Sequence, residues 1–372
     1  MFALPTCACK KVKRAAAAAL IAAIFAMPAA WAEPEGVALP AASAAEAAHA
    51  SEYAARWTSL HMGTIIAGQV FAGSPERASE LGRLVEDEIV RYDDMMSVHK
   101  ATVLNDVNRL AGQWVEVTPE IAEMTQEAVR VAKLTDGAFE PTIGPLVNLW
   151  KIGFGGHSVP SAEKIQAALK RVDYRRIEVK ETDGKWFVRI GKDQNIDMGA
   201  IAKGYIGQKL VEKLREAGAA RAVLDLGGNI ALLGQKREGA PWRVGLQRPD
   251  QQRGAYFAIV SAADVNVITS GAYERNFEKN GKRYGHILSA KTGMPVNAGL
   301  SSVTIVDKNG ARADALCTAL FGMGEAEAEA FLTAHPDVHA VLLSSDLKTV
   351  VMSRALQGIV DITDSALSVK LL

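Results

Sequence analysis

After residue 220 the chain consists mainly of short apolar runs separated by turns. The stretch RAVLDLGGNIALLG, residues 221–234, has the pattern of a buried strand, a glycine turn and a second strand. Strand-like runs continue as WRVGLQ, AYFAIV, VNVIT and SSVTIV, and HAVLLSSDLKTVVMS has the pattern of a closing hairpin. Strands and helices do not alternate in a regular strand–helix–strand rhythm, and no internal repeat is visible. The pattern predicts an α+β fold with largely antiparallel sheets and packed helices.

Helical patterns dominate the preceding part of the chain. Apolar residues recur at helical spacing after Pro75, namely Leu81, Leu84, Val85, Ile89 and Tyr92. A second helix is expected to begin at the cap Thr118 and to stop at Gly137, and Ser161 is expected to cap a third. The stretch HMGTIIAGQVFAG, residues 61–73, predicts a strand with a turn, and ADALCTALFGMG, residues 313–324, predicts a short helix.

The first 32 residues have the pattern of a cleavable signal peptide. Four basic residues between Lys10 and Arg14 precede the apolar stretch AAAAALIAAIFAM, and Ala30-Trp31-Ala32 supplies a small-residue cleavage site. The alternative is an uncleaved anchor, although the apolar stretch is short for a membrane span. We expect cleavage after Ala32, export to the periplasm and no stable membrane insertion of the mature chain. Residues 33–55 are expected to form a loose lead-in, and residues 56–372 one folded domain.

Charge and cysteine content exclude some classes of protein. Removing the signal peptide takes away four of the 42 basic side chains and leaves 38 against 42 acidic ones. A mildly acidic chain has no electrostatic reason to bind nucleic acid. Cys7 and Cys9 leave with the signal peptide, so Cys317 remains alone and no internal disulfide can form.

Asp314 and Thr318 form a candidate metal site in the predicted helix at residues 313–324. At positions i and i+4 their oxygens share one face of a helix. A carboxylate and a hydroxyl are hard ligands suited to Mg²⁺, which takes few protein oxygens and keeps water or substrate phosphates. The alternative is structural, with Asp314 as a cap and Thr318 bonded back to a carbonyl, and the spacing alone favours it.

Other candidates are individually weak. In IDMGAIAKGYIGQKL, residues 196–210, Asp197 is either a helix cap or a functional group, and Lys203 is either solvated or functional. His286 is a candidate base because imidazole exchanges protons near neutral pH, although a single histidine at a strand edge is more often structural. Gly227 and Gly228 permit close approach of a ligand but also suit a tight turn. Neither a Rossmann glycine fingerprint nor a Walker lysine is present.

Six blocks follow one another along the chain, namely GAFEPTIGPLVNLWKIG, IDMGAIAKGY, LDLGGNIALLG, TSGAYERNF, GHILSAKTGMPV and ADALCTALFGMG. Taken together and in this order, they resemble the ApbE family of FAD:protein FMN transferases. The resemblance runs from about Met62 to beyond Met323. It implies an ApbE-like (T-fold-like) architecture and an enzyme that cleaves FAD and attaches FMN, through a phosphoester, to a Thr or Ser of another protein.

The resemblance also implies roles for particular residues. By this resemblance, His286 would lie beside the flavin and would assist deprotonation of the acceptor hydroxyl. The FAD-binding residues would be Met62, Ala138, Phe139, Glu140, Asp197 and Lys203. The Mg²⁺ ligands would be Asp314, Thr318 and the backbone oxygen of Ala200. The glycines and alanine of IDMGAIAKGY would let the backbone approach the nucleotide.

Two departures from the family pattern stand out. The family has an aromatic residue that stacks on the flavin after MS, whereas this chain continues with Val98 and His99, so His99 would stack less well. The family's HIIDPRTG is replaced by HILSAKTG, so Ser289 and Ala290 stand in place of Asp-Pro. We expect this loop to differ in geometry beside His286.

Three functions remain as alternatives. The first is the transferase, whose partners would be FMN-accepting domains of periplasm-facing or membrane redox proteins. The second is an FAD pyrophosphatase that gives FMN and AMP with nearly the same residues. The third is a non-catalytic flavin-binding protein, which a disabling change in the SAKTG loop would favour.

Overall fold

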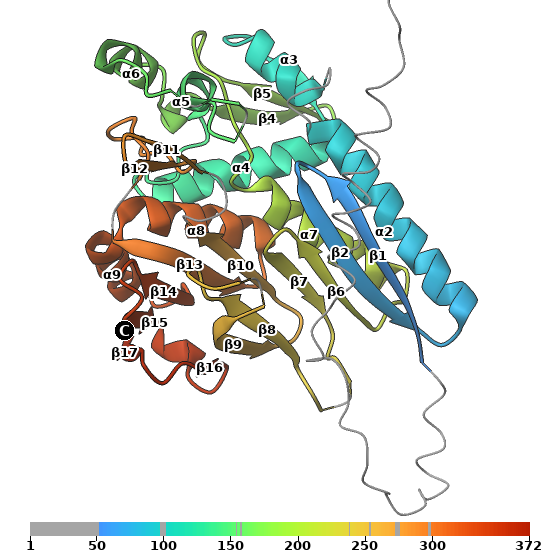
Figure 1. Cartoon of the computed structure of the whole chain (residues 1–372). Coiled ribbons are helices and arrows are strands. Elements are labelled where there is room, and N and C mark those ends of the chain that lie inside the picture. Colours follow the sequence, from blue (N-terminus) through green and yellow to red (C-terminus); the bar gives the residue numbers. More distant parts are fainter. Residues whose placement is uncertain are drawn as a thin grey trace, which may run out of the picture. The chain divides into compact units, whose positions relative to one another are not determined.

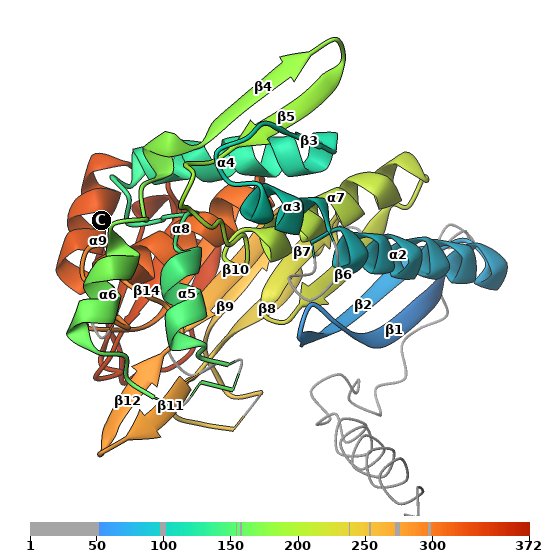
Figure 2. The same cartoon turned by 90° about the horizontal axis from the view of Figure 1, so that it is seen from above.

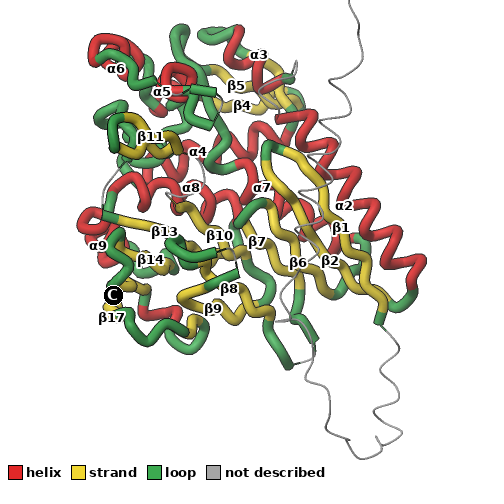
Figure 3. The backbone as a smooth tube through the Cα atoms, in the orientation of Figure 1, coloured by secondary structure: helices red, strands yellow, loops and turns green. Residues whose placement is uncertain are grey.

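The computed structural model of the protein describes residues 52–96, 102–153, 155–156, 158–237, 239–252, 254–271, 276–296 and 299–372. The expected signal peptide, residues 33–51 of the expected lead-in and His99 lie outside the described residues. The lead-in was expected to extend to residue 55, but a strand begins at Tyr53. Residues 51–372 form one compact unit that contains both helices and strands (Figures 1 and 3). Within the described part, no helix is both long enough and apolar enough to cross a membrane.

A nine-stranded sheet forms the centre of this unit, in the order β1-β2-β6-β7-β10-β13-β14-β15-β17. Neighbouring strands are antiparallel except β15 and β17. The prediction of an α+β fold with largely antiparallel sheets is therefore confirmed. The strands are β1 (Tyr53–His61), β2 (Thr64–Ala72), β6 (Arg221–Leu226), β7 (Asn229–Leu233), β10 (Asn266–Gly271), β13 (Leu300–Asp307), β14 (Ala340–Ser344), β15 (Thr349–Met352) and β17 (Ser368–Leu371).

Helices α2 (Pro75–Met96), α7 (Ala202–Glu216) and α8 (Gly310–Met323) cover one face of this sheet (Figures 1 and 2). Alternate residues of the central strands, such as Val70, Leu224 and Ile268, are buried beneath them in the main core. Helix α4 (Pro119–Leu134) packs on the outside of α8. A small sheet of β3 (Val115–Val117), β5 (Lys185–Arg189) and β4 (Glu178–Thr182) packs on α4 in turn.

The opposite face of the large sheet has a second core. Its residues include Trp242, Phe257 and Val306. Strands β8 (Trp242–Gln247), β9 (Tyr256–Ala262) and β16 (Val360–Ile362) supply part of it as a separate three-stranded sheet. A third, smaller core surrounds Trp150 and joins α5 (Gly144–Trp150), α6 (Ala162–Leu169) and the hairpin of β11 (Asn276–Lys279) and β12 (Lys282–Gly285). Helices α3 (Val103–Arg109) and α9 (Glu325–Ala334) and short 3₁₀ turns at Tyr174–Arg176 and Arg354–Leu356 complete the described elements.

Local sequence signals explain where several helices begin. The Thr118 side chain accepts a hydrogen bond from the Ile121 N–H, with Pro119 in the first turn, and Ser161 caps α6 in the same way. Both predicted caps are thus confirmed. The helix predicted at residues 313–324 begins three residues earlier, at Gly310, because Asn309 caps it.

Candidate active site

Helices α7 and α8 cross backbone to backbone at two glycines. A β-carbon on Gly204, in the first turn of α7, would overlap the Gly310 carbonyl oxygen and lie 2.7 Å from Asp314 Cβ. A β-carbon on Gly310 would likewise overlap the Gly204 carbonyl. Gly204 therefore serves the contact between helices. This corrects the expectation that the glycines of this segment all face a nucleotide.

Asp314 lies at this crossing and is only 2% exposed. Its Oδ2 accepts a hydrogen bond from the Gly204 N–H over 2.9 Å, and its Oδ1 lies 4.0 Å from Lys203 Nζ. In a regular helix, the Gly204 N–H would donate to the carbonyl four residues earlier, which is that of Ala200. No backbone N–H of the described residues donates to the Ala200 oxygen. Asp314 thus takes the donor that Ala200 would otherwise have.

The donor set at this helix end suits a hard cation. Thr318 stands one turn after Asp314 in α8 and is partly exposed, so a carboxylate, a hydroxyl and the Ala200 carbonyl come to the same region. Mg²⁺ is held by few protein oxygens and leaves positions for water and phosphate. No group of three or more His, Cys, Asp or Glu side chains in the described ranges could hold a metal ion. Metal binding at this site would therefore depend on these mixed oxygen ligands and on a bound substrate.

The segments around Glu140 and Asp197 lie side by side. The Asp197 N–H donates to the Pro141 carbonyl over 2.8 Å, and the Gly144 N–H donates to the Asn195 carbonyl over 3.1 Å. The Asp197 side chain accepts from the Gly199 N–H over 2.8 Å, which closes the turn that leads into α7. Two predicted site segments are thus joined directly, and the second of them leads into α7.

Glu140 is occupied by its own chain. It is 9% exposed and accepts hydrogen bonds from the Thr142 N–H, the Thr142 hydroxyl and the Tyr174 N–H over 2.7–2.9 Å. Burial raises the pKa of this carboxyl above its ordinary value of 4.5, although the hydrogen bonds oppose the change. Phe139 is buried in the main core, and the Ala138 carbonyl faces Gly322 near the end of α8. In the structure, Glu140 fixes the loop beside the candidate site.

Met62 occupies the tight turn between β1 and β2. Its φ of 51° is in the left-handed region, as is the φ of 68° of Gly63. The Met62 N–H donates to Asp93 Oδ1 of α2 over 3.0 Å, which holds this turn. Gly227 of the β6–β7 turn comes so close to Thr64 that a β-carbon on it would overlap the threonine hydroxyl. The role of Asp93 in holding this turn could not be predicted from the sequence, because Met62 lies 31 positions away.

His286 follows β12, whose Tyr284 ring stacks on Phe277 with 5.0 Å between the ring centres. The next residues form a closed turn in which the Gly293 N–H donates to the Ser289 carbonyl over 2.7 Å. The Ser289 hydroxyl accepts from the Thr292 N–H over 3.2 Å, so serine provides a side-chain acceptor at the position of the family's aspartate. The Trp150 indole N–H donates to the Gly293 carbonyl over 2.8 Å and anchors the turn.

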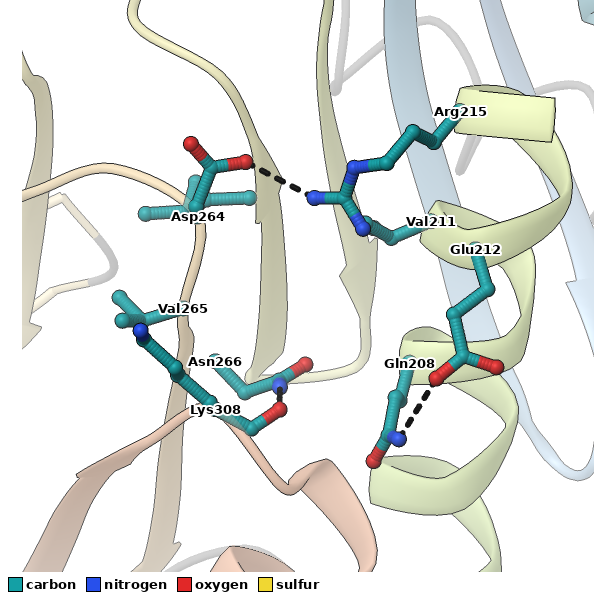
Figure 4. A pocket seen from close by; sticks show the side chains of 9 residues that line it. Gln208, Val211, Glu212, Arg215, Asp264, Val265, Asn266 and Lys308 are labelled. Carbon is teal, nitrogen blue, oxygen red and sulfur yellow. Dashed lines mark hydrogen bonds and ion pairs between the residues drawn. The ribbon is translucent and has the colours of Figure 1, made fainter. Parts of the chain in front are cut away.

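A cavity of about 290 Å³ lies towards the other end of α7 (Figure 4). None of the predicted site residues lines it. Gln208 on its wall accepts a hydrogen bond from the Gly310 N–H over 2.9 Å, and Arg215 pairs with Asp264 at 2.9 Å. Several polar side chains of the cavity wall are thus paired with other protein groups. The hydrogen bond from the Gly310 N–H to Gln208 also joins α7 to the start of α8. The lining residues are Gln208, Val211, Glu212, Arg215, Leu232, Asp264, Val265, Asn266 and Lys308.

Known proteins of one family are similar to this chain in sequence. Residues 62–342 match the model of the ApbE family. The FAD:protein FMN transferase of Klebsiella pneumoniae is 33% identical over 299 residues, covering 80% of this chain and 91% of that protein. The enzyme of the same name from Treponema pallidum is 34% identical over 319 residues, covering 81% of this chain and 86% of that protein.

Solved structures show the same fold. The ApbE protein from Thermotoga maritima superposes with a TM-score of 0.74 at 28% identity, covering 82% of this chain and 99% of that one. The flavinyl transferase ApbE from Pseudomonas stutzeri, in its apo form, superposes with a TM-score of 0.72 at 26% identity, covering 83% of this chain and 97% of that one. This chain belongs to the ApbE family.

Proposed function

We infer that this protein is an FAD:protein FMN transferase that requires Mg²⁺. The reaction is that of the similar proteins, which are named FAD:protein FMN transferases. The observation on this chain that best supports the proposal is the buried Asp314 carboxylate at the α7–α8 crossing. Asp314, Thr318 and the Ala200 carbonyl would hold the metal against the FAD pyrophosphate. When bound, the metal offsets the negative charge that develops as the phosphoanhydride breaks.

The chemistry is a phosphoryl transfer between hydroxyl and phosphate oxygens. The hydroxyl oxygen of an acceptor Thr or Ser forms a bond to the FMN-side phosphorus, and the bond from that phosphorus to the bridging oxygen breaks, so AMP leaves with that oxygen. His286 takes the hydroxyl proton. Met62, Ala138, Phe139, Asp197 and Lys203 would contribute to the FAD site, and the self-contained hydrogen bonds of Glu140 suggest that it acts by holding the loop. The ordered turn after His286 supports a working site rather than a protein that only stores flavin.

The remaining parts of the proposal concern place and partner. The N-terminal pattern supports export by a signal peptide cleaved after Ala32 and action in the periplasm. The acceptors would be FMN-binding domains of redox proteins that face this compartment. Covalent attachment suits such proteins, because dissociated FMN would be diluted away outside the cytoplasm.

The test incubates the chain from Glu33 onward with FAD, Mg²⁺ and exported candidate acceptors. Mass spectrometry follows the FMN increment on the acceptor, and chromatography follows AMP. Transfer supports the proposal. Release of FMN and AMP without labelling of any acceptor would favour the pyrophosphatase, and absence of turnover would favour a binding protein.

Two variants sharpen this test. Asp314→Asn retains an oxygen that can accept from the Gly204 N–H but removes the charge, so we expect a folded protein with transfer reduced by about 10²-fold or more. Asp337→Asn, at an exposed ion pair with Arg312, is the control and should keep full activity. His286→Ala should lower the rate by about 10²–10⁴-fold with little change in FAD affinity; equal losses would make His286 a binding residue.

A further inference from the structure

Asn229, the first residue of β7, has a buried side-chain donor with no acceptor in the part of the chain that the structure describes. The residue is 4% exposed, and its Nδ2 has no hydrogen-bond partner among the described residues. Trp57 Nε1 and Ser59 Oγ are also buried without a partner among the described residues. Both lie in β1, the edge strand of the large sheet, and not beside the candidate site. Because an unpaired buried donor destabilises a folded chain, such an atom calls for a reason.

The strand register shows which way Asn229 faces. Residues two apart on a strand share a face, so Asn229 lies on the same side of the sheet as Ala231. The Ala231 side chain lies beneath Gly207 of α7, where a β-carbon would be 3.3 Å away. Asn229 lies two residues before Ala231 on β7, and Gly204 lies about one helical turn before Gly207 on α7. Asn229 therefore faces the first turn of α7, where the Gly204 N–H donates to Asp314. Figures 1 and 2 show the start of β7 beneath this end of α7.

Helix α8 borders the same position from the other side. Asn229 is paired with Ile268 of β10, and the Cys317 thiol of α8 donates to the Ile268 carbonyl over 2.9 Å. Cys317 lies between the two proposed metal ligands in sequence. The Asn229 amide is therefore beside both helices that form the candidate site.

The turn before Asn229 places no side chain over it. Gly227 and Gly228 both have positive φ, 70° and 94°, and both are partly exposed. The Gly228 N–H donates to Asp225 Oδ1 over 2.7 Å, which fixes the turn. The two residues before Asn229 thus contribute only backbone next to its amide.

We propose that Asn229 Nδ2 donates a hydrogen bond to a pyrophosphate oxygen of bound FAD. The proposal rests on the function inferred above, which places the pyrophosphate at Asp314, Thr318 and Ala200. A donor that has no acceptor among the described residues gains one when the anionic substrate arrives, so binding removes an existing energetic cost. A hydrogen bond to an anionic oxygen is also stronger than one between neutral groups. Asn229 is thereby a positioning and binding residue for FAD.

This role predicts that stability and binding respond in opposite directions. Asn229→Leu removes the unpaired donor at similar volume, so the free protein should be at least as stable as the wild type in urea unfolding. Its Kd for FAD, measured by flavin fluorescence in EDTA, should rise about tenfold or more. Asn229→Asp keeps the shape of the side chain but repels the pyrophosphate, so its Kd should rise further. Ser59→Ala removes a comparable unpaired atom in β1 and should leave the Kd unchanged.

The outcomes separate the two proposals. If wild-type protein binds FAD neither in EDTA nor with Mg²⁺, the inferred function is wrong and the role of Asn229 is overturned with it. If the wild type binds and both Asn229 variants bind equally well, the role of Asn229 is overturned. A destabilised Asn229→Leu with unchanged Kd would show a structural role only. If Asn229→Leu does not fold, the isosteric Asn229→Asp decides by its Kd alone.

Discussion

At the scale of single residues, Asp314 shows how far the sequence leads. Its spacing from Thr318 placed both oxygens on one face of a predicted helix, and the structure confirms that helix. Spacing alone nevertheless favoured a structural role for Asp314. It could not show that the partner of Asp314 is Gly204, 110 positions away. The Gly204 N–H donates to Asp314, so the Ala200 carbonyl has no backbone donor in the described part. This is a tertiary contact, which no local sequence pattern predicts.

Glu140 gives a prediction about pH. Burial raises its pKa in the folded protein above 4.5, the ordinary value, so the folded state holds this proton at a pH where the unfolded state has lost it. The stability that this group contributes is therefore fully present below about 4.5 and is lost as the pH rises through the raised folded pKa. Relative to Glu140→Gln, the free energy of unfolding of the wild type should decline over that window. Urea unfolding of both proteins between about pH 4 and pH 7 checks this.

The glutamine variant is a suitable reference because it does not titrate. It should also be the less stable protein at low pH, since its amide N–H₂ would face the Tyr174 N–H. A difference between the two proteins that stays constant with pH would contradict the raised pKa. If the stability of the wild type relative to the glutamine variant increased with pH, the pKa of Glu140 would be lowered by folding and not raised.

At the scale of elements, helices and hairpins that depend on local signals were predictable. The caps Thr118 and Ser161 act within a few residues, and both were expected. A turn was expected within residues 61–73, and it lies at Met62-Gly63, between two strands. Strand β3 was not expected, because Val115–Val117 is short and pairs with β5 some 70 positions later. The glycine crossing was likewise hidden, since each glycine has meaning only beside the other helix.

The crossing predicts the effect of Gly204→Ala. The new methyl group would overlap the Gly310 carbonyl and crowd Asp314, both of which are held in backbone or helix positions. We expect a loss of about 1–3 kcal/mol in the free energy of unfolding, typical of overpacking, and a loss of transfer activity because Asp314 shifts. Urea unfolding and FMN transfer measure the two effects.

Gly73→Ala is the matched control for that change. Gly73 is exposed, has no heavy atom within 4 Å of an added β-carbon and does not have a positive φ. Its stability should stay within about 0.5 kcal/mol of the wild type. Equal behaviour of the two alanine variants would show that α7 and α8 are not in backbone contact.

The turn after His286 predicts the effect of Ser289 variants. Ser289→Ala removes the acceptor of the Thr292 N–H and should cost about 1 kcal/mol of stability and slow transfer by loosening the turn beside His286. Ser289→Asp restores the residue that the family pattern has and provides another acceptor, so it should fold and transfer FMN at close to the wild-type rate. If the alanine variant matches the wild type in both measurements, the hydroxyl does not hold the turn.

At the scale of the whole molecule, the fold class was predictable but the strand order was not. Hairpin neighbours such as β6 and β7 follow one another in sequence, so an antiparallel arrangement could be inferred. The pairing of β2 with β6 joins strands about 150 positions apart and brings the Met62 and Gly227 turns together. No local pattern had indicated that these two turns meet, so the contact between them required the structure.

The charge of the whole molecule leads to a prediction about its acceptor. With 38 basic and 42 acidic side chains after removal of the signal peptide, the protein has little net charge for long-range steering, so transfer should depend only weakly on salt. Recognition would then depend on the shape of the acceptor loop. We expect that a short loop with a Thr or Ser and a glycine, grafted from an acceptor onto an unrelated exported protein, is sufficient for FMN attachment. A graft with valine at the acceptor position is the control, and mass spectrometry at low and high salt is the measurement. If only the intact native domain is labelled, recognition uses a wider interface than one loop.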